Sequence, residues 1–287
     1  MKLQDPLPVR VLTKNIRYAT NNPFEGEERW TERRPYLTKE LLFNTLNCQE
    51  SFICLQEVLH NQIEDIWSDL NAAEEWAYIG VGRDDGDKAG EYSPIFYRTS
   101  VWVLEKWDTV WLSRTPSKPS KDWDAGSIRI LTIGVFTHRA TKRKVVAMNT
   151  HLDDASSRSR LESAKIILSQ IKEAHDYKGL PVFLGGDFNS EPGEEAYLEV
   201  TGDSSPMADL KLLVPASRQY GDSNTFSGFT EATRRKRIDF IFLGHPTEQG
   251  GPGSTWSPTG YAVLPNRFED GVYNSDHEVV VGDMELV

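Results

Sequence analysis

The sequence of 287 residues predicts a single α/β domain. Short apolar runs rich in β-branched residues alternate along the chain with longer segments whose apolar residues recur at helical spacing. No internal repeat, low-complexity segment or long linker divides the chain, and its length is sufficient for one large packed core. We therefore expect one domain that spans residues 1–287.

The apolar runs predict eight strands, which are residues 9–16, 52–58, 78–82, 93–97, 130–136, 144–152, 180–188 and 237–243. A helix is expected at residues 157–175, where apolar residues recur every three or four positions; they are Leu161, Ala164, Ile167, Leu168, Ile171 and Ala174. Residues 36–46 and 59–70 show the same spacing. The segments 113–127 and 245–260 are rich in Pro, Ser and Gly, which predicts surface loops.

Composition and charge limit the partners of the protein. A formal net charge of −11 disfavours tight, non-specific binding of nucleic acid without excluding it. The densest basic run is "RRKR" at 234–237, which we interpret as a solvated turn. The chain shows no apolar run long enough to cross a bilayer and no targeting segment. We expect a monomer that is either cytoplasmic or secreted after removal of a signal peptide.

Only two cysteines are present, Cys48 and Cys54. They lie six residues apart, and Cys54 belongs to an apolar run that predicts a strand. We therefore expect no disulfide and no catalytic role for either thiol.

Acids, amides and histidines occur where the predicted strands end. They are Asn15, Glu57, Asn149, His151, Asp187, Asn189, Asp239, Asp276 and His277. Each alone is more often a cap, a turn residue or a hydrogen-bonded core group. Together they would crowd charge at one sheet edge, and hard oxygen ligands without cysteine indicate Mg²⁺, with Mn²⁺ as a substitute, rather than zinc. The pattern predicts a site for phosphate-ester chemistry.

Two short motifs suggest how such a site works. In "GDFN", Asp187 and Asn189 flank Phe188, so in an extended chain both polar side chains point to one side and Phe188 points to the other. An acid that orients or deprotonates water beside an amide that binds a phosphoryl oxygen suits in-line attack on phosphorus. In "SDH", His277 could pair with Asp239 as a carboxylate–imidazole unit.

Six motifs in order resemble the endonuclease/exonuclease/phosphatase superfamily of DNase I-like proteins; they are "TKNIR", "LQEV", "NTHLD", "GGDFNS", "RIDFIF" and "NSDHEVV". The resemblance spans nearly the whole chain. Three further strings resemble a microbial and fungal branch of family proteins; they are "ERWTERR", "GEYSPIFYR" and "KDWDAGSIRI". The resemblance implies a four-layer α/β sandwich, with two central mixed β-sheets flanked by helices and a site between the sheet edges.

The resemblance also implies roles for individual residues. Asn15, Glu57 and Asp276 would be metal-side groups. Asp187 and Asn189 would orient the attacking water and the phosphoryl oxygen. His151 would contact the scissile phosphate, and His277 with Asp239 would form the acid–base or charge-stabilising pair.

The substrate is less determined than the reaction. We expect a Mg²⁺-dependent phosphoesterase acting on a small phosphorylated metabolite of the sugar or inositol phosphate type, through a phosphomonoester or phosphodiester bond. A metal-dependent nuclease is the alternative enzyme, and a silent binding module with this fold is the alternative outside catalysis. Candidate pocket residues, with surface ion pairing as the competing interpretation for each arginine, are Glu91, Arg98, Trp123, Asp124, Arg129 and Arg160.

Overall fold

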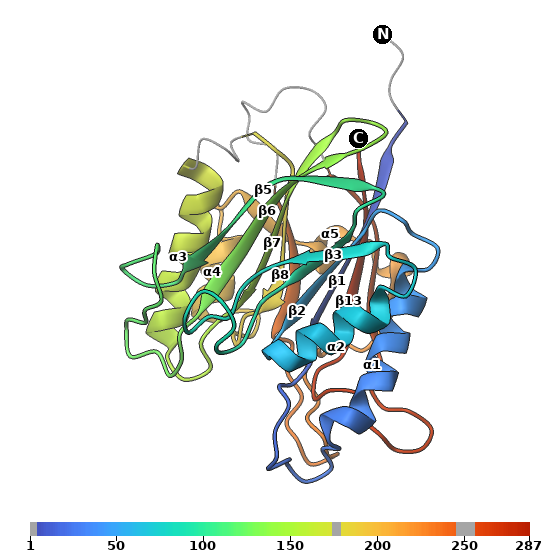
Figure 1. Ribbon diagram of the computed structural model, residues 1–287. Helices are drawn as coiled ribbons and strands as arrows, with labels where there is room; N and C mark the ends of the chain where they lie inside the picture. Colours follow the sequence, from blue (N-terminus) through green and yellow to red (C-terminus); the bar gives the residue numbers. More distant parts are fainter. Residues whose placement is uncertain (1–4, 174–178, 245–255) are drawn as a thin grey trace.

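Two β-sheets pack face to face, with helices on both outer sides (Figure 1). The computed structural model describes residues 5–173, 179–244 and 256–287. This arrangement is the four-layer α/β sandwich that the family resemblance implies, and the prediction of the fold is confirmed. Among the described residues, no helix is both long enough and apolar enough to cross a membrane.

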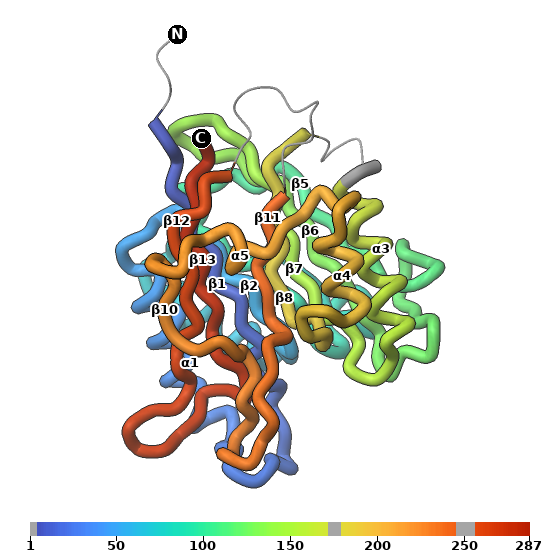
Figure 2. The backbone as a smooth tube through the Cα atoms, turned by 180° about the vertical axis from the view of Figure 1, so that it is seen from behind, coloured from blue at the N-terminus to red at the C-terminus, as the bar shows by residue number. Residues whose placement is uncertain are grey.

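One sheet has seven strands in the order β10-β12-β13-β1-β2-β4-β3. Their bounds are β1 Leu7–Asn15, β2 Ser51–Gln56, β3 Trp76–Ile79, β4 Ile95–Arg98, β10 Gln219–Gly221, β12 Trp256–Leu264 and β13 Val279–Leu286. Strands β1 and β2 are parallel, and β13 pairs with β1 in the antiparallel sense. Figure 2 shows β12, β13, β1 and β2 side by side.

The other sheet has six strands in the order β5-β6-β7-β8-β11-β9. Their bounds are β5 Trp102–Trp111, β6 Ile130–His138, β7 Lys144–His151, β8 Val182–Asp187, β9 Met207–Asp209 and β11 Asp239–Gly244. Strands β7 and β8 are parallel, whereas β11 is antiparallel to β8. Both sheets are therefore mixed.

Three apolar clusters hold the layers together because successive side chains of each strand point to opposite faces. Phe52 and Cys54 of β2 belong to the cluster between the two sheets, whereas Ile53 and Leu55 pack against α1 (Trp30–Thr45) and α2 (His60–Leu70). The outer face of the six-stranded sheet packs against α3 (Ser157–Glu173) and α4 (Glu195–Thr201). Two short helical turns, α5 (Leu210–Leu213) and the 3₁₀ turn Ala216–Arg218, complete the elements.

The "GG" before Asp187 is explained by close packing. A Cβ at Gly185 would lie 3.2 Å from the Cβ of Cys54 and 3.3 Å from the Cβ of Thr13, both in the opposite sheet. A Cβ at Gly186, whose φ is +159°, would lie 2.4 Å from the carbonyl oxygen of Thr150. Two glycines therefore let β8 approach its neighbours closely just before the polar end of the strand.

Several elements differ from the prediction. The helix expected at 36–46 begins at Trp30, since Pro35 lies inside α1 and does not end it. Part of the loop expected at 245–260 forms strand β12, and the rest of that loop lies outside the described residues, as does Ala174 of the expected helix 157–175. The segment 113–127 contains no helix or strand, as expected for a surface loop.

The basic run "RRKR" is only partly a solvated turn. Arg237 is buried two residues before β11, and its Nη2 donates to Asp209 Oδ1 at 2.7 Å. Arg234 and Arg235 are exposed. The interpretation of the whole run as solvated is therefore wrong for its last residue.

Candidate active site

The polar strand ends converge at one edge of the sandwich. β1 and β2 are parallel, as are β7 and β8, so each pair presents its carboxyl ends together, and β11 and the residues before β13 start at the same edge. The register places Asp187 opposite both His151 and Asp239. This topology gathers side chains from distant parts of the sequence, and those gathered are Asn15, Glu57, His151, Asp187, Asn189, Asp239, Asp276 and His277.

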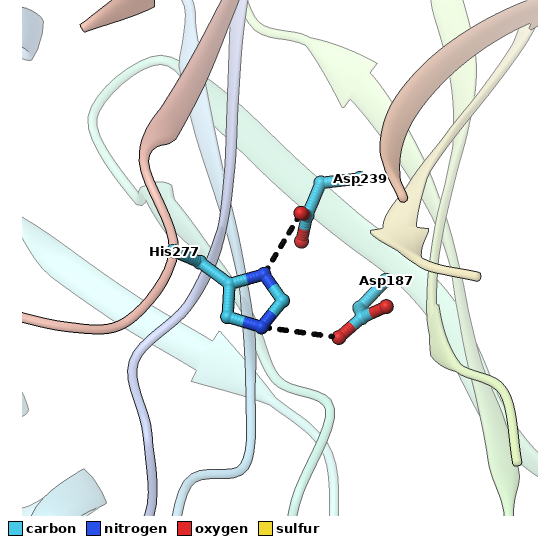
Figure 3. A group of neighbouring side chains, drawn as sticks. All are labelled: Asp187, Asp239 and His277. Carbon is cyan, nitrogen blue, oxygen red and sulfur yellow. Dashed lines mark hydrogen bonds and ion pairs between the residues drawn. The ribbon is translucent and has the colours of Figure 1, made fainter. Parts of the chain in front are cut away.

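His277 lies between two carboxylates (Figure 3). Its Nδ1 lies 2.8 Å from Asp239 Oδ2, and its Nε2 lies 3.7 Å from Asp187 Oδ2. Burial would lower the pKa of His277, but the Asp239 and Asp187 carboxylates outweigh it and raise that pKa well above its ordinary value. Thr225 Oγ1 also donates to Asp239 Oδ2, at 2.6 Å. The arrangement holds His277 as an imidazolium.

Asp187 and Asn189 face the site, whereas Phe188 is fully buried in the outer core, as their alternation predicts. The backbone N–H of Asn189 donates to Asp187 Oδ1 at 2.9 Å, and Asn189 Nδ2 lies 3.1 Å from His151 Nε2. Burial, then the neighbouring Asp239, raises the pKa of Asp187. A raised pKa suits a carboxylate that accepts a proton from water.

Glu57 and Asn15 form the opposite side of the site. Asn15 Nδ2 donates to Glu57 Oε1 at 2.9 Å and to Asp187 Oδ2 at 3.0 Å, so one amide links both acids. The backbone N–H of Tyr18 donates to Glu57 Oε2 at 3.1 Å. Burial, followed by the charge of Glu91, raises the pKa of Glu57. This carboxylate is therefore under-compensated by the protein around it.

The backbone is strained at the same place. Arg17, Glu57 and Asn189 have φ values of 58°, 59° and 47°, in the left-handed region that non-glycine residues rarely adopt. Such conformations persist where surrounding contacts impose them, and they concentrate at functional sites.

Side chains behind the site hold its loops. Arg33 of α1 is fully buried, and its guanidinium donates to the backbone carbonyls of Ile16, Arg17, Glu28 and Asn274. Three of these carbonyls flank Asn15 or Asp276, so Arg33 fixes both loops. Asn149, one of the predicted strand-end residues, performs a similar task between the sheets, where its Nδ2 donates to the carbonyls of Leu55 and Pro94 at 2.8 Å each.

The converging residues border a pocket of about 440 Å³. The wall of the pocket includes two arginines, Arg83 and Arg129, each of which is ion-paired with a carboxylate. Arg83 forms a two-point contact with Glu91, at 2.7 and 2.9 Å, and Arg129 Nη2 donates to Asp154 Oδ1 at 2.7 Å. The pocket residues that the sequence did not indicate are Arg17, Tyr18, Arg83, Ser127, Asp154, Phe226, Lys236 and Ile238.

Three buried nitrogen atoms of pocket residues have no hydrogen-bond partner among the described residues; they are Arg83 Nε, Arg129 Nη1 and His151 Nδ1. Burial, then the adjacent Arg129 guanidinium, lowers the pKa of His151 to about 4, so the ring is neutral near pH 7. With Asn189 Nδ2 donating to His151 Nε2, the ring proton resides on Nδ1. Three unpaired N–H donors therefore belong to this pocket.

Four of the predicted pocket residues are not brought to the pocket. Arg98 ends β4 at the opposite edge of its sheet, where it donates to the carbonyls of Thr45 and Cys48, because β4 runs antiparallel to β2. Arg160 pairs with Glu195 instead. The remaining two, Trp123 and Asp124, belong to the 113–127 loop and do not line the pocket. Glu91 and Arg129 do line it.

The structure offers two arrangements of metal-ligating groups. Asp187, Asp239 and His277 bring their ligand atoms within 4.8 Å of one another, close enough to share a metal ion. Both ring nitrogens of His277 already face carboxylates, however, so an ion there would replace that pairing. The second arrangement is formed by Glu57 and Asp276 on the pocket wall, with Asn15 beside Glu57. A metal ion bound there would leave the pairing of His277 with Asp239 and Asp187 intact.

Comparison with known proteins agrees with this geometry. The family model described as the endonuclease/exonuclease/phosphatase family matches residues 20–277. The chain belongs to this family. It is accordingly a metal-dependent phosphoric ester hydrolase, since the family and its members are phosphatases and nucleases.

Two bacterial structures resemble the whole chain. A family protein from Bacteroides vulgatus is 33% identical with a TM-score of 0.83, and the match covers 98% of this chain and 99% of that one. A mannosyl-6-phosphatase from Bacteroides thetaiotaomicron is 29% identical with a TM-score of 0.83, covering 96% and 99%. Nocturnin from Drosophila melanogaster is 24% identical over 90% of this chain, but the match spans only 42% of nocturnin.

Proposed function

We propose that the protein is a Mg²⁺-dependent phosphomonoesterase that removes phosphate from a small sugar-type phosphate. This proposal rests on two of the three buried, unpaired donors, Arg129 Nη1 and His151 Nδ1, in a pocket that also contains Asp187 and His277. Buried donors without acceptors are costly, and a phosphoryl group supplies acceptors for both.

The proposed roles follow from the contacts. Arg129 and His151 bind phosphoryl oxygens, and Asn189 holds His151 in the tautomer that donates from Nδ1. Asp187 orients the attacking water and accepts its proton. The His277 imidazolium, held by Asp239, stabilises the charge that develops on the phosphoryl group or the leaving oxygen. Water attacks phosphorus, the P–O bond to the sugar breaks, and an alcohol and inorganic phosphate leave.

The metal fits the Glu57 side of the site. The under-compensated Glu57 carboxylate and the Asp276 carboxylate are hard oxygen donors of the kind that Mg²⁺ prefers, and we propose that they hold it, with Glu57 positioned by the Asn15 amide N–H. When bound, the ion neutralises phosphoryl charge and orients the ester.

The size and charge of the pocket support a small, hydroxylated substrate. The ion pairs Arg83–Glu91 and Arg129–Asp154 place donors and acceptors side by side, as a ring with several hydroxyl groups requires. The similar bacterial structure is named a mannosyl-6-phosphatase, which agrees with a sugar phosphate. A nuclease is the second candidate because of the likeness to nocturnin, but the net charge of −11 opposes binding of a long polyanion.

The experiment compares Arg129→Met with the wild-type enzyme. If Arg129 binds the phosphoryl group, competitive inhibition by inorganic phosphate weakens by about tenfold or more, since a charge-assisted hydrogen bond is lost. Arg160→Met is the matched control, because Arg160 is mostly buried and ion-paired but lies outside the pocket. An unchanged inhibition constant in Arg129→Met, or equal weakening in both variants, would refute the assignment.

A further inference from the structure

A second hollow of about 470 Å³ is lined in part by residues of β10 and β12, the last two strands at one edge of the seven-stranded sheet. A smaller hollow of about 180 Å³ adjoins it, and both are lined by Tyr220, Gly221 and Asp222. The side chain of Tyr220 is 72% exposed. An exposed aromatic ring therefore stands between two adjacent hollows.

The larger hollow is separated from the active site by one layer of backbone. Phe226 bridges both Lys236 and His277, and all three residues line the active-site pocket. Their sequence neighbours Arg235 and Glu278 line the hollow instead, as expected when alternate residues of extended chains face opposite sides. No described residue lines both cavities.

Glu278 is the unusual group in this hollow. The residue is only 2% exposed, and its Oε2 has no hydrogen-bond partner among the described residues. Its nearest cation, Arg235 Nη2, lies 3.7 Å from the other carboxylate oxygen. Burial raises the pKa of Glu278. A buried, unpaired carboxyl oxygen is costly unless a ligand donates to it. Tyr261, on the wall of the smaller hollow, is also buried, and the Arg237 guanidinium lies over its ring.

The surrounding charges disfavour an ionic ligand. Arg235 is paired with Asp222, and Arg267 lies 3.7 Å from Glu231, so neither guanidinium is free for an anion. Glu278 repels an anion further, whereas a cation would compete with both arginines. The ion pairs Arg235–Asp222 and Arg267–Glu231 offer hydrogen-bond donors and acceptors side by side, as hydroxyl groups require. Glu278 can accept a hydrogen bond from a hydroxyl group whether or not it is protonated.

We propose that the two hollows form an auxiliary binding site for an uncharged sugar chain, distinct from the catalytic pocket. One sugar unit stacks its apolar face on Tyr220, a neighbouring unit donates a hydroxyl to Glu278 in the larger hollow, and the chain continues toward Tyr261. The site would hold a carbohydrate beside the catalytic pocket without presenting it to the reacting residues. This assignment does not depend on the identity of the phosphorylated substrate.

Binding of unphosphorylated oligosaccharides to the full chain tests the proposal. Mannotriose, maltotriose and cellotriose are titrated by saturation-transfer NMR, with inorganic phosphate saturating the catalytic pocket. Spermidine and sulfate serve as charged probes. We expect at least one trisaccharide to bind at millimolar concentrations and neither charged probe to compete with it.

Two variants locate the binding. Tyr220→Ala weakens it by roughly tenfold, the loss expected for one aromatic stacking surface, and leaves hydrolysis of an aryl phosphate unchanged. Phe43→Ala removes another exposed aromatic ring, 76% exposed on α1, and has no effect. Glu278→Met, which removes both carboxyl oxygens at similar volume, weakens binding in a protein that remains folded by circular dichroism. Absence of trisaccharide binding, equal loss in Phe43→Ala, competition by spermidine or sulfate, or no effect of either hollow variant would overturn the proposal.

Discussion

Asp239→Asn should move the pH dependence of catalysis and not merely its rate. Asp239 is fully buried, and its Oδ2 accepts from both His277 Nδ1 and Thr225 Oγ1. The amide keeps the volume of the side chain but removes the charge that most raises the pKa of His277. That pKa should therefore fall toward its ordinary value, while Asp187 still opposes the fall.

The size of the effect follows from the contact that is lost. A hydrogen bond to a charged group contributes about 1.5–3 kcal/mol, which corresponds to roughly one to two units of pKa and a tenfold to hundredfold loss in kcat. Since the imidazolium is the proposed active form, activity is lost as the pH rises through the pKa of His277. In Asp239→Asn the alkaline limb of the kcat profile should therefore lie at lower pH than in the wild-type enzyme.

The assay is steady-state hydrolysis of an aryl phosphate at saturating Mg²⁺ between pH 5 and about 10, the range that brackets an ordinary and a raised histidine pKa. Asp209→Asn is the matched control, because Asp209 is also buried and paired, with Arg237, but lies outside the pocket. The control should lower stability and leave the limb in place. His277→Ala combined with Asp239→Asn should be far from additive, because the two groups act as one unit. An unmoved limb in Asp239→Asn, or additive losses in the double variant, would refute the pairing.

Three further outcomes are expected. Glu57→Gln should weaken Mg²⁺ binding in calorimetric titration by about tenfold or more while leaving the fold intact, since a ligand charge is removed at a strand end; unchanged affinity would place the metal elsewhere. Arg33→Met should lower kcat by about tenfold in the folded fraction, because four backbone carbonyls lose their hydrogen-bond donor. The control, Arg34→Met, breaks partly exposed ion pairs and should leave kcat unchanged. Equal effects of the two variants on kcat would assign Arg33 a role in stability alone. Cys48→Ser with Cys54→Ala should cost about 1–2 kcal/mol in denaturant unfolding, since Cys54 is fully buried, and should retain the specific activity; a large loss of activity would reveal a role for a thiol.

The convergence of the candidate catalytic residues was predictable because these residues lie at the ends of strongly apolar strands. Asp187 ends "VFLGG" and Asp239 begins "FIFL", so period-two alternation and strand pairing are enough to place them at one edge. The strands that the sequence did not predict include β13, despite its apolar start at Val279–Val281, and also β5 and β12, whose patterns are weaker. β5 carries several charged and exposed positions at a sheet edge, and β12 follows a segment rich in Gly and Pro, so neither resembles a buried strand.

The pocket wall was less predictable for a different reason. Arg83 and Glu91 lie eight residues apart in a turn-rich loop, and only the folded loop brings their side chains together. Arg98 occurs in a similar sequence context but at the far end of β4, and strand direction alone separates it from the pocket. Arg33 belongs to the string "ERWTERR", but the sequence did not indicate its role, because a buried arginine that binds carbonyls resembles any other helical arginine before the fold is known.

Under the proposed function, this site cleaves a phosphomonoester on a small sugar. The most direct measurement is the release of inorganic phosphate from mannose 6-phosphate and glucose 6-phosphate, compared at equal concentration with a single-stranded oligonucleotide, in Mg²⁺ and again after EDTA. We expect Mg²⁺-dependent release from a sugar phosphate, abolished by EDTA and by His277→Ala, with cleavage of the oligonucleotide at least about a hundredfold slower in kcat/KM. Faster cleavage of the oligonucleotide, or release of phosphate from the sugar that persists in EDTA, would contradict the claim.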